Sequence, residues 1–339
     1  MKIIVVTAAT FPKAGGLYGA VRELFTNKRF LPHHVEILGY VNDKTDPKDW
    51  QGTCLKLFKK YFFGISWRLK DYMLQSDADI MHMEFIWRYP QILMPAWKKK
   101  KKKPIVMSLH GRLDPYIVSH QHWTKRIISK LFFDPTLNSV DCFHALCKKE
   151  MEDMRQYGIK GPIAIIPNGV ILPDNTKMYK KLDKKKHLLY LGRLHKKKGV
   201  DILIEAFAQL VKQNFLEDDW VLDVVGWNHE GGKKELDEIV EKYHINSRVI
   251  FHGALFGQDK ERMYAISDAY ILPSHGEGLP LTILEAWAWA KPVVMTAKCN
   301  IPEGVEFNAA IEIEDNINST KEGLLKIMRM SDLERREIG

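Results

Sequence analysis

Short apolar segments alternate with longer amphipathic segments along almost the whole chain. The apolar segments have the length and composition of buried strands, and the segments between them repeat apolar residues at helical spacing. Helices are predicted, for example, at residues 17–25, 65–75 and 123–132. The strands predicted in the first half are 3–7, 35–39, 79–83, 104–109, 140–145 and 162–166. Such alternation is typical of parallel sheets that are covered by helices on both faces.

A polar stretch at residues 174–186 interrupts this alternation and is interpreted as a linker between domains. The alternation then begins again. The strands predicted in the second half are 187–191, 220–225, 248–251, 269–272, 292–296 and 310–313. We therefore predict an α/β protein with two doubly wound, Rossmann-like domains, residues 1–170 and 171–339, that face each other across a central cleft.

The composition is that of a soluble globular protein, with 45% apolar and 27% charged residues. No window approaches the roughly 18 apolar residues that a membrane-spanning helix needs. The first strand is too short for the apolar part of a signal peptide. The four cysteines lack the spacing of metal ligands, which fits a reducing compartment. We therefore expect a cytoplasmic protein without a catalytic metal.

The net charge of +9 is concentrated in lysine clusters at residues 98–103, 180–186 and 196–198. A nucleic acid is not the expected partner, because no aromatic-interleaved or finger motif accompanies these lysines. An anionic membrane surface is a possible partner, since each basic residue near it contributes about 1 kcal/mol. A peripheral position on the inner face of a membrane and a merely solvated lysine-rich surface both stay open.

Two carboxylates lie eight positions apart near the predicted strand 269–272. Glu277 lies in a Gly/Pro-rich loop after that strand, and Glu285 lies in the helix that follows the loop. The first N–H groups of a helix have no partner within the helix and attract phosphate. The carboxylates repel phosphate, so we expect them to accept hydrogen bonds from hydroxyl groups. Phosphate and hydroxyl recognition together predict a nucleotide-sugar site.

Two cations, Arg193 and Lys198, follow the first strand of the second domain and precede Gly199. At this spacing they could hold a diphosphate and neutralise the charge that grows on it as it leaves. A solvated basic loop would have the same composition. The acidic loop, which is predicted at the carboxyl end of another strand of the same sheet, favours the functional interpretation.

The first domain offers two further candidates at the carboxyl ends of predicted strands. His110 follows an apolar strand and precedes Gly111, so we expect its ring to point into the cleft. Gly15 and Gly16 lie in a loop that enters a helix, where the backbone could approach a ligand closely. Residues 8–13 separate this loop from its strand, which argues against the dinucleotide fingerprint of a nicotinamide dehydrogenase.

Taken together, these motifs resemble the family-4 glycosyltransferases, which are retaining enzymes of the GT-B fold. The resemblance covers nearly all of the chain. It rests on Gly15-Gly16, Ile166-Pro167-Asn168-Gly169-Val170, Gly192-Arg193 with Lys198-Gly199, and the pair Glu277 and Glu285. It implies transfer of a sugar from a nucleotide-diphosphate sugar to an acceptor hydroxyl with retention, in polysaccharide, glycan or glycolipid synthesis. UDP, GDP and ADP donors all stay open.

The resemblance also implies a role for each matching residue. Glu277 would bind hydroxyls of the transferred sugar and Glu285 those of the ribose. Arg193 and Lys198 would hold the diphosphate, and His110 would hydrogen-bond the donor sugar near the reacting carbon. No metal or other cofactor is implied. The other donor-binding residues that it implies are Gly15, Gly16, His252, Gly253, Gly278, Leu279, Pro280 and Leu281.

One departure from the family pattern lies at residues 334–339, where the chain stops before the expected helix that returns to the first domain. We expect no donor-site residue to be lost with it. Two alternatives to a transferase also stay open. A sugar-nucleotide epimerase on the same scaffold would act on the donor without an acceptor. A basic protein that binds nucleic acid or anionic lipid would lose affinity steeply with salt.

Overall fold

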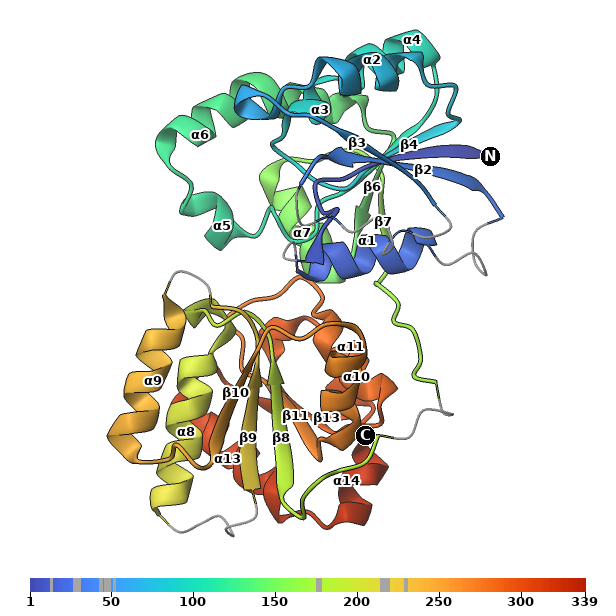
Figure 1. The fold of residues 1–339 in the computed structure, drawn as a ribbon. Coiled ribbons are helices and arrows are strands. Elements are labelled where there is room, and N and C mark those ends of the chain that lie inside the picture. The colour runs from blue at the N-terminus through green and yellow to red at the C-terminus, as the bar shows by residue number, and fades with distance from the viewer. Residues whose placement is uncertain are drawn as a thin grey trace. The chain divides into compact units, whose positions relative to one another are not determined.

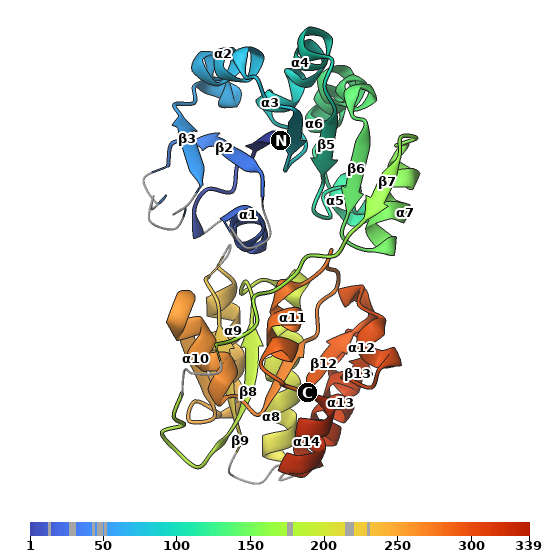
Figure 2. The ribbon, with the colours of Figure 1, turned by 90° about the vertical axis from the view of Figure 1, so that its right-hand side faces the viewer.

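The computed structural model describes residues 1–12, 15–26, 32–42, 45, 50, 53–174, 179–213, 220–228 and 231–339. Within them the chain forms two compact units, Met1–Gly169 and Val170–Gly339 (Figures 1 and 2). Each unit contains one sheet in which every paired strand is parallel, with helices packed on both faces. The predicted boundary, residue 170, lies beside the observed one.

Unit 1 contains a seven-stranded sheet in the order β3-β2-β1-β4-β5-β6-β7. Its strands are β1 (Lys2–Val6), β2 (His34–Tyr40), β3 (Cys54–Phe58), β4 (Ile80–Met83), β5 (Ile105–Ser108), β6 (Cys142–Ala145) and β7 (Ile163–Ile165). The helices are α1 (Gly16–Thr26), α2 (Trp67–Gln75), α3 (Tyr89–Ile92), α4 (Met94–Lys101), α5 (Pro115–Ser119), α6 (Trp123–Ile128) and α7 (Lys148–Tyr157). Alternate residues of β1 are buried in different clusters, Ile4 in one and Val5 in the other, so both faces of this strand are covered.

Unit 2 contains a six-stranded sheet in the order β10-β9-β8-β11-β12-β13. Its strands are β8 (Lys186–Leu191), β9 (Trp220–Val225), β10 (Val249–Gly253), β11 (Ala269–Leu272), β12 (Val293–Thr296) and β13 (Ala310–Ile313). The helices are α8 (Val200–Lys212), α9 (Gly232–Tyr243), α10 (Gly257–Ile266), α11 (Leu281–Ala288), α12 (Glu303–Glu306), α13 (Ile317–Arg329) and α14 (Asp332–Ile338). The apolar runs of β9 and β11 are buried along their whole length, as central parallel strands require.

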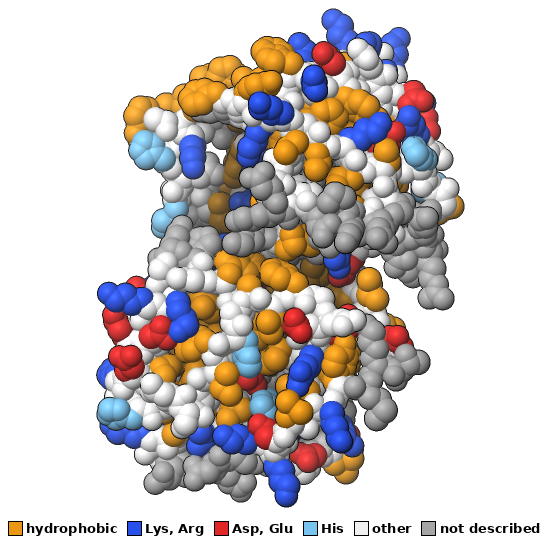
Figure 3. Space-filling view, in the orientation of Figure 1, with side chains coloured by type: hydrophobic (Ala, Val, Ile, Leu, Met, Phe, Trp, Pro, Cys, Tyr) orange, Lys and Arg blue, Asp and Glu red, His pale blue; other side chains and the backbone are white. Residues whose placement is uncertain are grey.

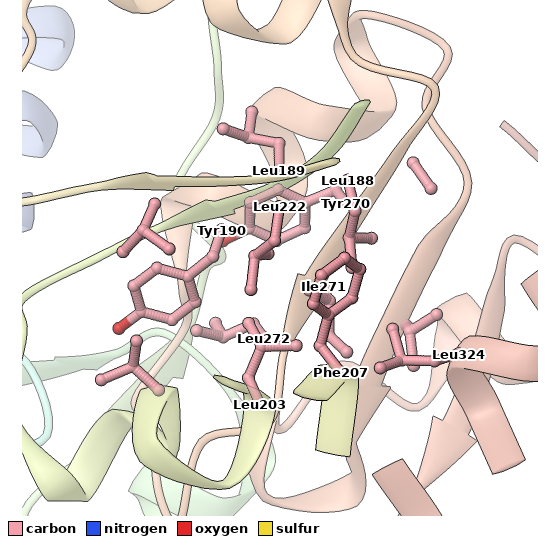
Figure 4. Packing of buried hydrophobic residues seen from close by; sticks show 14 of the residues in the cluster. Leu188, Leu189, Tyr190, Leu203, Phe207, Leu222, Tyr270, Ile271, Leu272 and Leu324 are labelled. Carbon is pink, nitrogen blue, oxygen red and sulfur yellow. The ribbon is translucent and has the colours of Figure 1, made fainter. Parts of the chain in front are cut away.

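Two tyrosines connect the core of unit 2 to the segments that follow the carboxyl ends of β8 and β11. Tyr190 and Tyr270 lie among aliphatic side chains of β8, β11 and α8 (Figure 4). The Tyr190 hydroxyl donates to the carbonyl oxygen of Arg193 over 2.9 Å, and the Tyr270 hydroxyl donates to Thr282 Oγ1 over 2.7 Å. Burial raises the pKa of both phenols well above the ordinary value, so the hydroxyls keep their donor protons. The loop after β8 and the start of α11 are therefore tied to the core.

Each sheet has one point where the direction of winding reverses. In unit 1 this point lies between β1 and β4, and in unit 2 it lies between β8 and β11. Ligands of open α/β sheets bind beyond the carboxyl ends of the strands at such points. The loops after β8 and β11 contain the two cations and the acidic loop that the sequence singles out.

All predicted strands are present, but the structure corrects several boundaries. The edge strand β3 was not predicted. β10 continues through His252 and Gly253, which were expected in a loop. The helix predicted at 123–132 is shorter, because α6 ends at Ile128 and a π-helical turn, Ser129–Phe133, follows it. Strand β8 begins at the last residue of the predicted linker, and linker residues 175–178 lie outside the described residues.

Candidate nucleotide-sugar site

The loops after β8 and β11 lie against each other at the reversal point of unit 2. The backbone N–H of His275 donates to the Lys197 carbonyl oxygen over 2.9 Å, and Ser274 Oγ donates to the same oxygen over 3.0 Å. Gly199 has a φ of +65°, and a Cβ at this position would lie 2.0 Å from the Pro273 carbonyl oxygen. Only glycine fits this contact, which keeps the two loops together.

A bidentate ion pair joins the two loops. Lys198 Nζ donates to both carboxylate oxygens of Glu277, over 2.5 and 2.7 Å. The Lys198 side chain is only 17% exposed and the Glu277 side chain only 10%. Water therefore screens this pair less than it screens a surface pair. An ammonium group has three N–H donors, so the third can reach a ligand. The structure thus brings together the two residues that the sequence assigns to the diphosphate and to the sugar.

The segment after β12 fixes the position of Glu277. The Glu277 N–H donates to the Lys298 carbonyl oxygen over 3.0 Å, and Asn300 Nδ2 donates to the Glu277 carbonyl oxygen over 2.5 Å. The buried Thr296 donates to the Ser274 carbonyl oxygen over 2.6 Å. Asn300 has a φ of +59°, a left-handed conformation that asparagine tolerates better than most residues. The sequence analysis missed these supporting residues, whose partners are distant in sequence.

Arg193 lies at the start of the β8 loop, and its side chain is half-buried. In the described part of the chain, no carboxylate forms an ion pair with its guanidinium. The loop after β9 supports this region, because the Leu194 N–H donates to the Trp227 carbonyl oxygen over 3.1 Å. A Cβ on Gly226 would lie 1.8 Å from the Gly192 carbonyl oxygen, so these backbones are in direct contact. That Arg193 binds the diphosphate together with Lys198 stays a prediction.

The second glutamate, Glu285, lies on α11 beyond the acidic loop. It accepts hydrogen bonds from Lys260 Nζ over 2.5 Å and from the Tyr264 hydroxyl over 2.9 Å, so α10 holds it in place. Helix α11 begins at Leu281 without a side-chain cap, which leaves its N-terminus open to an anion. The predicted donor-binding residues here are Gly278, Leu279 and Pro280 before this helix and Leu281 at its start; Pro280 has no N–H, so it cannot donate to the anion.

His252 lies in β10 and belongs to a hydrogen-bonded triad. Its Nε2 lies 2.6 Å from Asp223 Oδ1, and His187 Nδ1 lies 2.6 Å from Asp223 Oδ2. Burial alone would raise the pKa of Asp223, but the hydrogen bonds from the two histidines lower it. Asp223, which the sequence analysis missed, therefore orients the His252 ring. The neighbouring Gly253 has a φ of +70°.

The glycine-rich loop of unit 1 leads directly into α1. Gly15 has a φ of +72°, and its N–H donates to the Pro12 carbonyl oxygen over 3.0 Å. Gly16 is the first residue of α1, and a Cβ there would meet no atom of the described residues within 4 Å. Lys13 and Ala14 of the same loop lie outside the described residues. The role of Gly15 and Gly16 as backbone ligands stays a prediction.

His110 follows β5 in a left-handed turn. Its φ is +52° and that of Gly111 is +69°, which is an uncommon conformation for a residue other than glycine. The buried carboxylate of Glu150 stabilises this turn. It accepts hydrogen bonds from the N–H of Gly111 over 2.5 Å and from the N–H of Leu146 over 2.7 Å. Glu150 at the start of α7 was not singled out by the sequence analysis.

A second buried carboxylate, Glu84, holds the His110 ring. Glu84 Oε2 lies 2.5 Å from His110 Nε2, and Glu84 Oε1 lies 3.2 Å from His82 Nε2. Burial alone would raise the pKa of Glu84, but the two histidines lower it to about 2. Glu84 therefore stays ionised although it is buried, because His82 and His110 contact its carboxylate.

The hydrogen bonds continue from His82 across three neighbouring strands. His82 Nε2 lies 2.8 Å from Ser108 Oγ, which lies 2.8 Å from His144 Nδ1. His144 Nε2 donates to the Ile166 carbonyl oxygen over 2.7 Å. Burial lowers the pKa of His82, and the charge of Glu84 opposes this shift. Each side chain in this series of hydrogen bonds, from Glu84 to His144, has a partner, so Glu84 has little freedom to move.

No group of three or more His, Cys, Asp and Glu side chains among the described residues could hold a metal ion. No helix in the described ranges is long and apolar enough to cross a membrane.

Two family models match nearly the whole chain. "Glycosyltransferase Family 4" matches residues 32–172, and "Glycosyl transferases group 1" matches residues 173–338. The chain belongs to glycosyltransferase family 4. Both models together include the His110 turn, the β8 loop and the two glutamates.

Solved structures and curated relatives agree with this family. Anabaena HepE in complex with UDP and glucose has a TM-score of 0.79 at 19% identity, over 100% of this glycosyltransferase and 92% of that chain. Sucrose-phosphate synthase from Thermosynechococcus elongatus has a TM-score of 0.75 at 18% identity, over 100% and 94% of the two chains. The fold is therefore GT-B. The alpha-monoglucosyldiacylglycerol synthase of Streptococcus pneumoniae is 26% identical over 87% of this glycosyltransferase and 70% of its own length.

Replacing Glu84 tests whether it positions His110 in this glycosyltransferase. Glu84→Gln keeps the shape of the side chain but removes the charge that both histidines contact. We expect kcat to fall about tenfold to a hundredfold, because small displacements of a catalytic group have effects of this size. Affinity for nucleoside diphosphate should not change, since the cations predicted to hold that ligand, Arg193 and Lys198, lie in unit 2. Steady-state kinetics and calorimetric titration measure the two quantities.

Glu36→Gln is the matched control. Glu36 is another buried carboxylate of unit 1, which accepts a hydrogen bond from the Tyr72 hydroxyl over 2.6 Å, and it does not contact His110. This variant should unfold at a lower temperature and keep its kcat. A Glu84→Gln enzyme with an unchanged kcat would show that Glu84 has no positioning role.

Proposed function

We propose that this glycosyltransferase moves a glycosyl unit from a nucleoside-diphosphate sugar to an acceptor hydroxyl, with retention of the anomeric configuration. The observation that carries the proposal is the Lys198–Glu277 pair at the reversal point between β8 and β11. The diphosphate of such a donor requires a cation, and the hydroxyls of its sugar require a group that accepts hydrogen bonds. Arg193 lies on the same loop and can supply a second cation.

In the proposed reaction, the bond between the anomeric carbon and the diphosphate oxygen breaks as the acceptor oxygen bonds to the same carbon. The acceptor hydroxyl gives its proton to the departing diphosphate oxygen, and nucleoside diphosphate is released. Lys198 and Arg193 stabilise the negative charge on the leaving group. Glu277 orients the sugar through its hydroxyls, and Glu285 binds those of the ribose. His110 donates a hydrogen bond to the donor sugar.

A cysteine nucleophile is not supported near this site. Cys299 is fully buried. Burial and, secondarily, the negative charge of Glu277 raise the pKa of its thiol to about 12. A thiol with this pKa is not ionised at neutral pH and cannot attack the sugar.

The relatives suggest which substrates to test first. HepE was solved with UDP and glucose, and the pneumococcal relative is a monoglucosyldiacylglycerol synthase. We propose a UDP-hexose as the donor and a glycolipid or a growing polysaccharide as the acceptor. His252, which Asp223 orients, and Gly253 contact the base in this arrangement. The enzyme acts at the membrane as a peripheral protein.

A panel of UDP, GDP and ADP sugars tests this function in two steps. We expect UDP-hexoses to raise the unfolding temperature, and we expect release of UDP to require an acceptor lipid or saccharide. NMR of the product should show the same anomeric configuration as the donor. Conversion of the sugar without an acceptor would instead identify an epimerase. An inverted product would refute retention, and a panel in which no nucleotide sugar binds would refute the proposed site.

A further inference from the structure

One helical segment of unit 1 exposes an unusual share of large apolar side chains. It comprises α6 and the π-helical turn after it, residues 123–132, and is called here the docking segment. No side chain of α6 is buried. The exposed apolar residues are Trp123 (65%), Ile127 (48%), Ile128 (43%), Leu131 (64%) and Phe132 (56%). Figure 3 shows hydrophobic side chains gathered on this edge of unit 1, where Figure 1 labels α6.

The apolar residues of the docking segment form a single face. Trp123 and Ile127 follow one another along α6, Leu131 continues this row into the π-helical turn, and Ile128 and Phe132 form an adjacent row. These rows cover roughly half of the circumference. Ser129 is buried and lies outside these rows, so the segment contacts the protein along a narrow strip at Ser129, and the exposed Lys125, Arg126 and Lys130 lie between that strip and the apolar rows. The apolar face therefore points away from the core of unit 1.

The polar positions of the docking segment are basic. Lys125, Arg126 and Lys130 are exposed, and no acidic residue occurs between His122 and Phe133. Among the described residues, no carboxylate forms an ion pair with these three cations. The lysine run at 98–103 differs, because Lys98 pairs with Asp141 and Lys103 pairs with Asp79.

We propose that the docking segment binds the surface of an anionic membrane. A helix with an outward apolar face, flanking cations and a tryptophan matches the chemistry of an interfacial helix. The apolar side chains would enter the boundary between headgroups and acyl chains, and the cations would contact lipid phosphates. A protein partner is the less favoured occupant, since the net positive charge without any carboxylate matches a uniformly anionic surface.

Sedimentation with lipid vesicles tests the proposal without donor or acceptor, so its outcome is separate from that of the proposed reaction. The full chain should bind vesicles that mix phosphatidylglycerol with phosphatidylcholine. It should bind pure phosphatidylcholine more weakly, and salt should weaken the electrostatic part. The triple variant Trp123→Ser, Leu131→Ser, Phe132→Ser should bind at least about tenfold more weakly. Lys125→Gln, Arg126→Gln, Lys130→Gln should lose roughly fivefold for each cation and should lose the lipid preference.

Two controls distinguish binding through the docking segment from nonspecific adsorption of exposed aromatic residues and from binding through the lysine run. Phe307 is an aromatic of unit 2 that is 77% exposed, and Phe307→Ser should bind vesicles as the unaltered protein does. The same result is expected for Lys99→Gln, Lys100→Gln, Lys101→Gln. Thermal unfolding of each variant checks the fold. The proposal is overturned if the unaltered protein does not sediment with anionic vesicles, or if the docking-segment variants bind as well as it does.

Discussion

Lys198→Ala should reduce kcat/KM for the nucleotide sugar by about a hundredfold to a thousandfold. This is the usual effect of removing one group that stabilises charge developing in the transition state. The ammonium group lies in a half-buried site beside Glu277, where water does not replace its contribution fully. The affinity for free UDP should fall as well, because the same cation holds the diphosphate before and after transfer. Kinetics and calorimetric titration with UDP measure both effects.

Lys196→Ala is the matched control, because it removes a lysine from the same loop. Lys196 is 70% exposed and pairs with Glu235 at 3.1 Å on the surface. Exposed pairs contribute little to stability and are screened by salt. This variant should therefore keep its activity and its affinity for UDP. Equal losses in the two variants would show that the loop acts only through its general positive charge.

Glu277→Gln should separate binding of the sugar from binding of the diphosphate. An amide cannot replace both carboxylate oxygens as an acceptor, so we expect kcat to fall by about a hundredfold or more through lost orientation of the sugar. The affinity for UDP should be unchanged or higher, because the substitution removes a negative charge next to Lys198. Kinetics and calorimetric titration with UDP measure these effects too. Lys198→Ala should lose affinity for UDP, whereas Glu277→Gln should keep or increase it.

Glu235→Gln provides the corresponding control. It neutralises the exposed partner of Lys196, and neither UDP binding nor transfer should change. If Glu277→Gln lost UDP affinity as strongly as Lys198→Ala does, Glu277 would be part of the diphosphate site. The assignment of Glu277 to the sugar would then be wrong.

The repeated pattern of the chain was sufficient to predict the fold. Buried parallel strands such as β9 and β11 are apolar at nearly every position, and that pattern is visible without a structure. Strand β3 was missed because Cys54–Phe58 is a short edge strand with every residue half-buried. The π-helical turn after α6 could not be predicted either. The apolar spacing of residues 123–132 is helical, and nothing in it indicates a change of helix type.

The candidate site was predictable where a local motif marks it. Lys198 and Glu277 lie in glycine-rich loops after strands, and the structure places them in direct contact. Their roles in binding stay predictions. Glu84, Glu150 and Asp223 were missed because each has a partner in or next to the predicted site that is distant in sequence. Nothing in the sequence around Glu84 indicates that His110, which is 26 positions away, contacts it.

A crystal structure of the protein with UDP bound tests the central claim most directly. That claim is that the loops after β8 and β11 together hold the diphosphate of the donor. We predict diphosphate oxygens within hydrogen-bonding distance of Lys198 Nζ and the Arg193 guanidinium, next to the N-terminus of α11. A diphosphate bound elsewhere, with Lys198 still paired only to Glu277, would contradict the account.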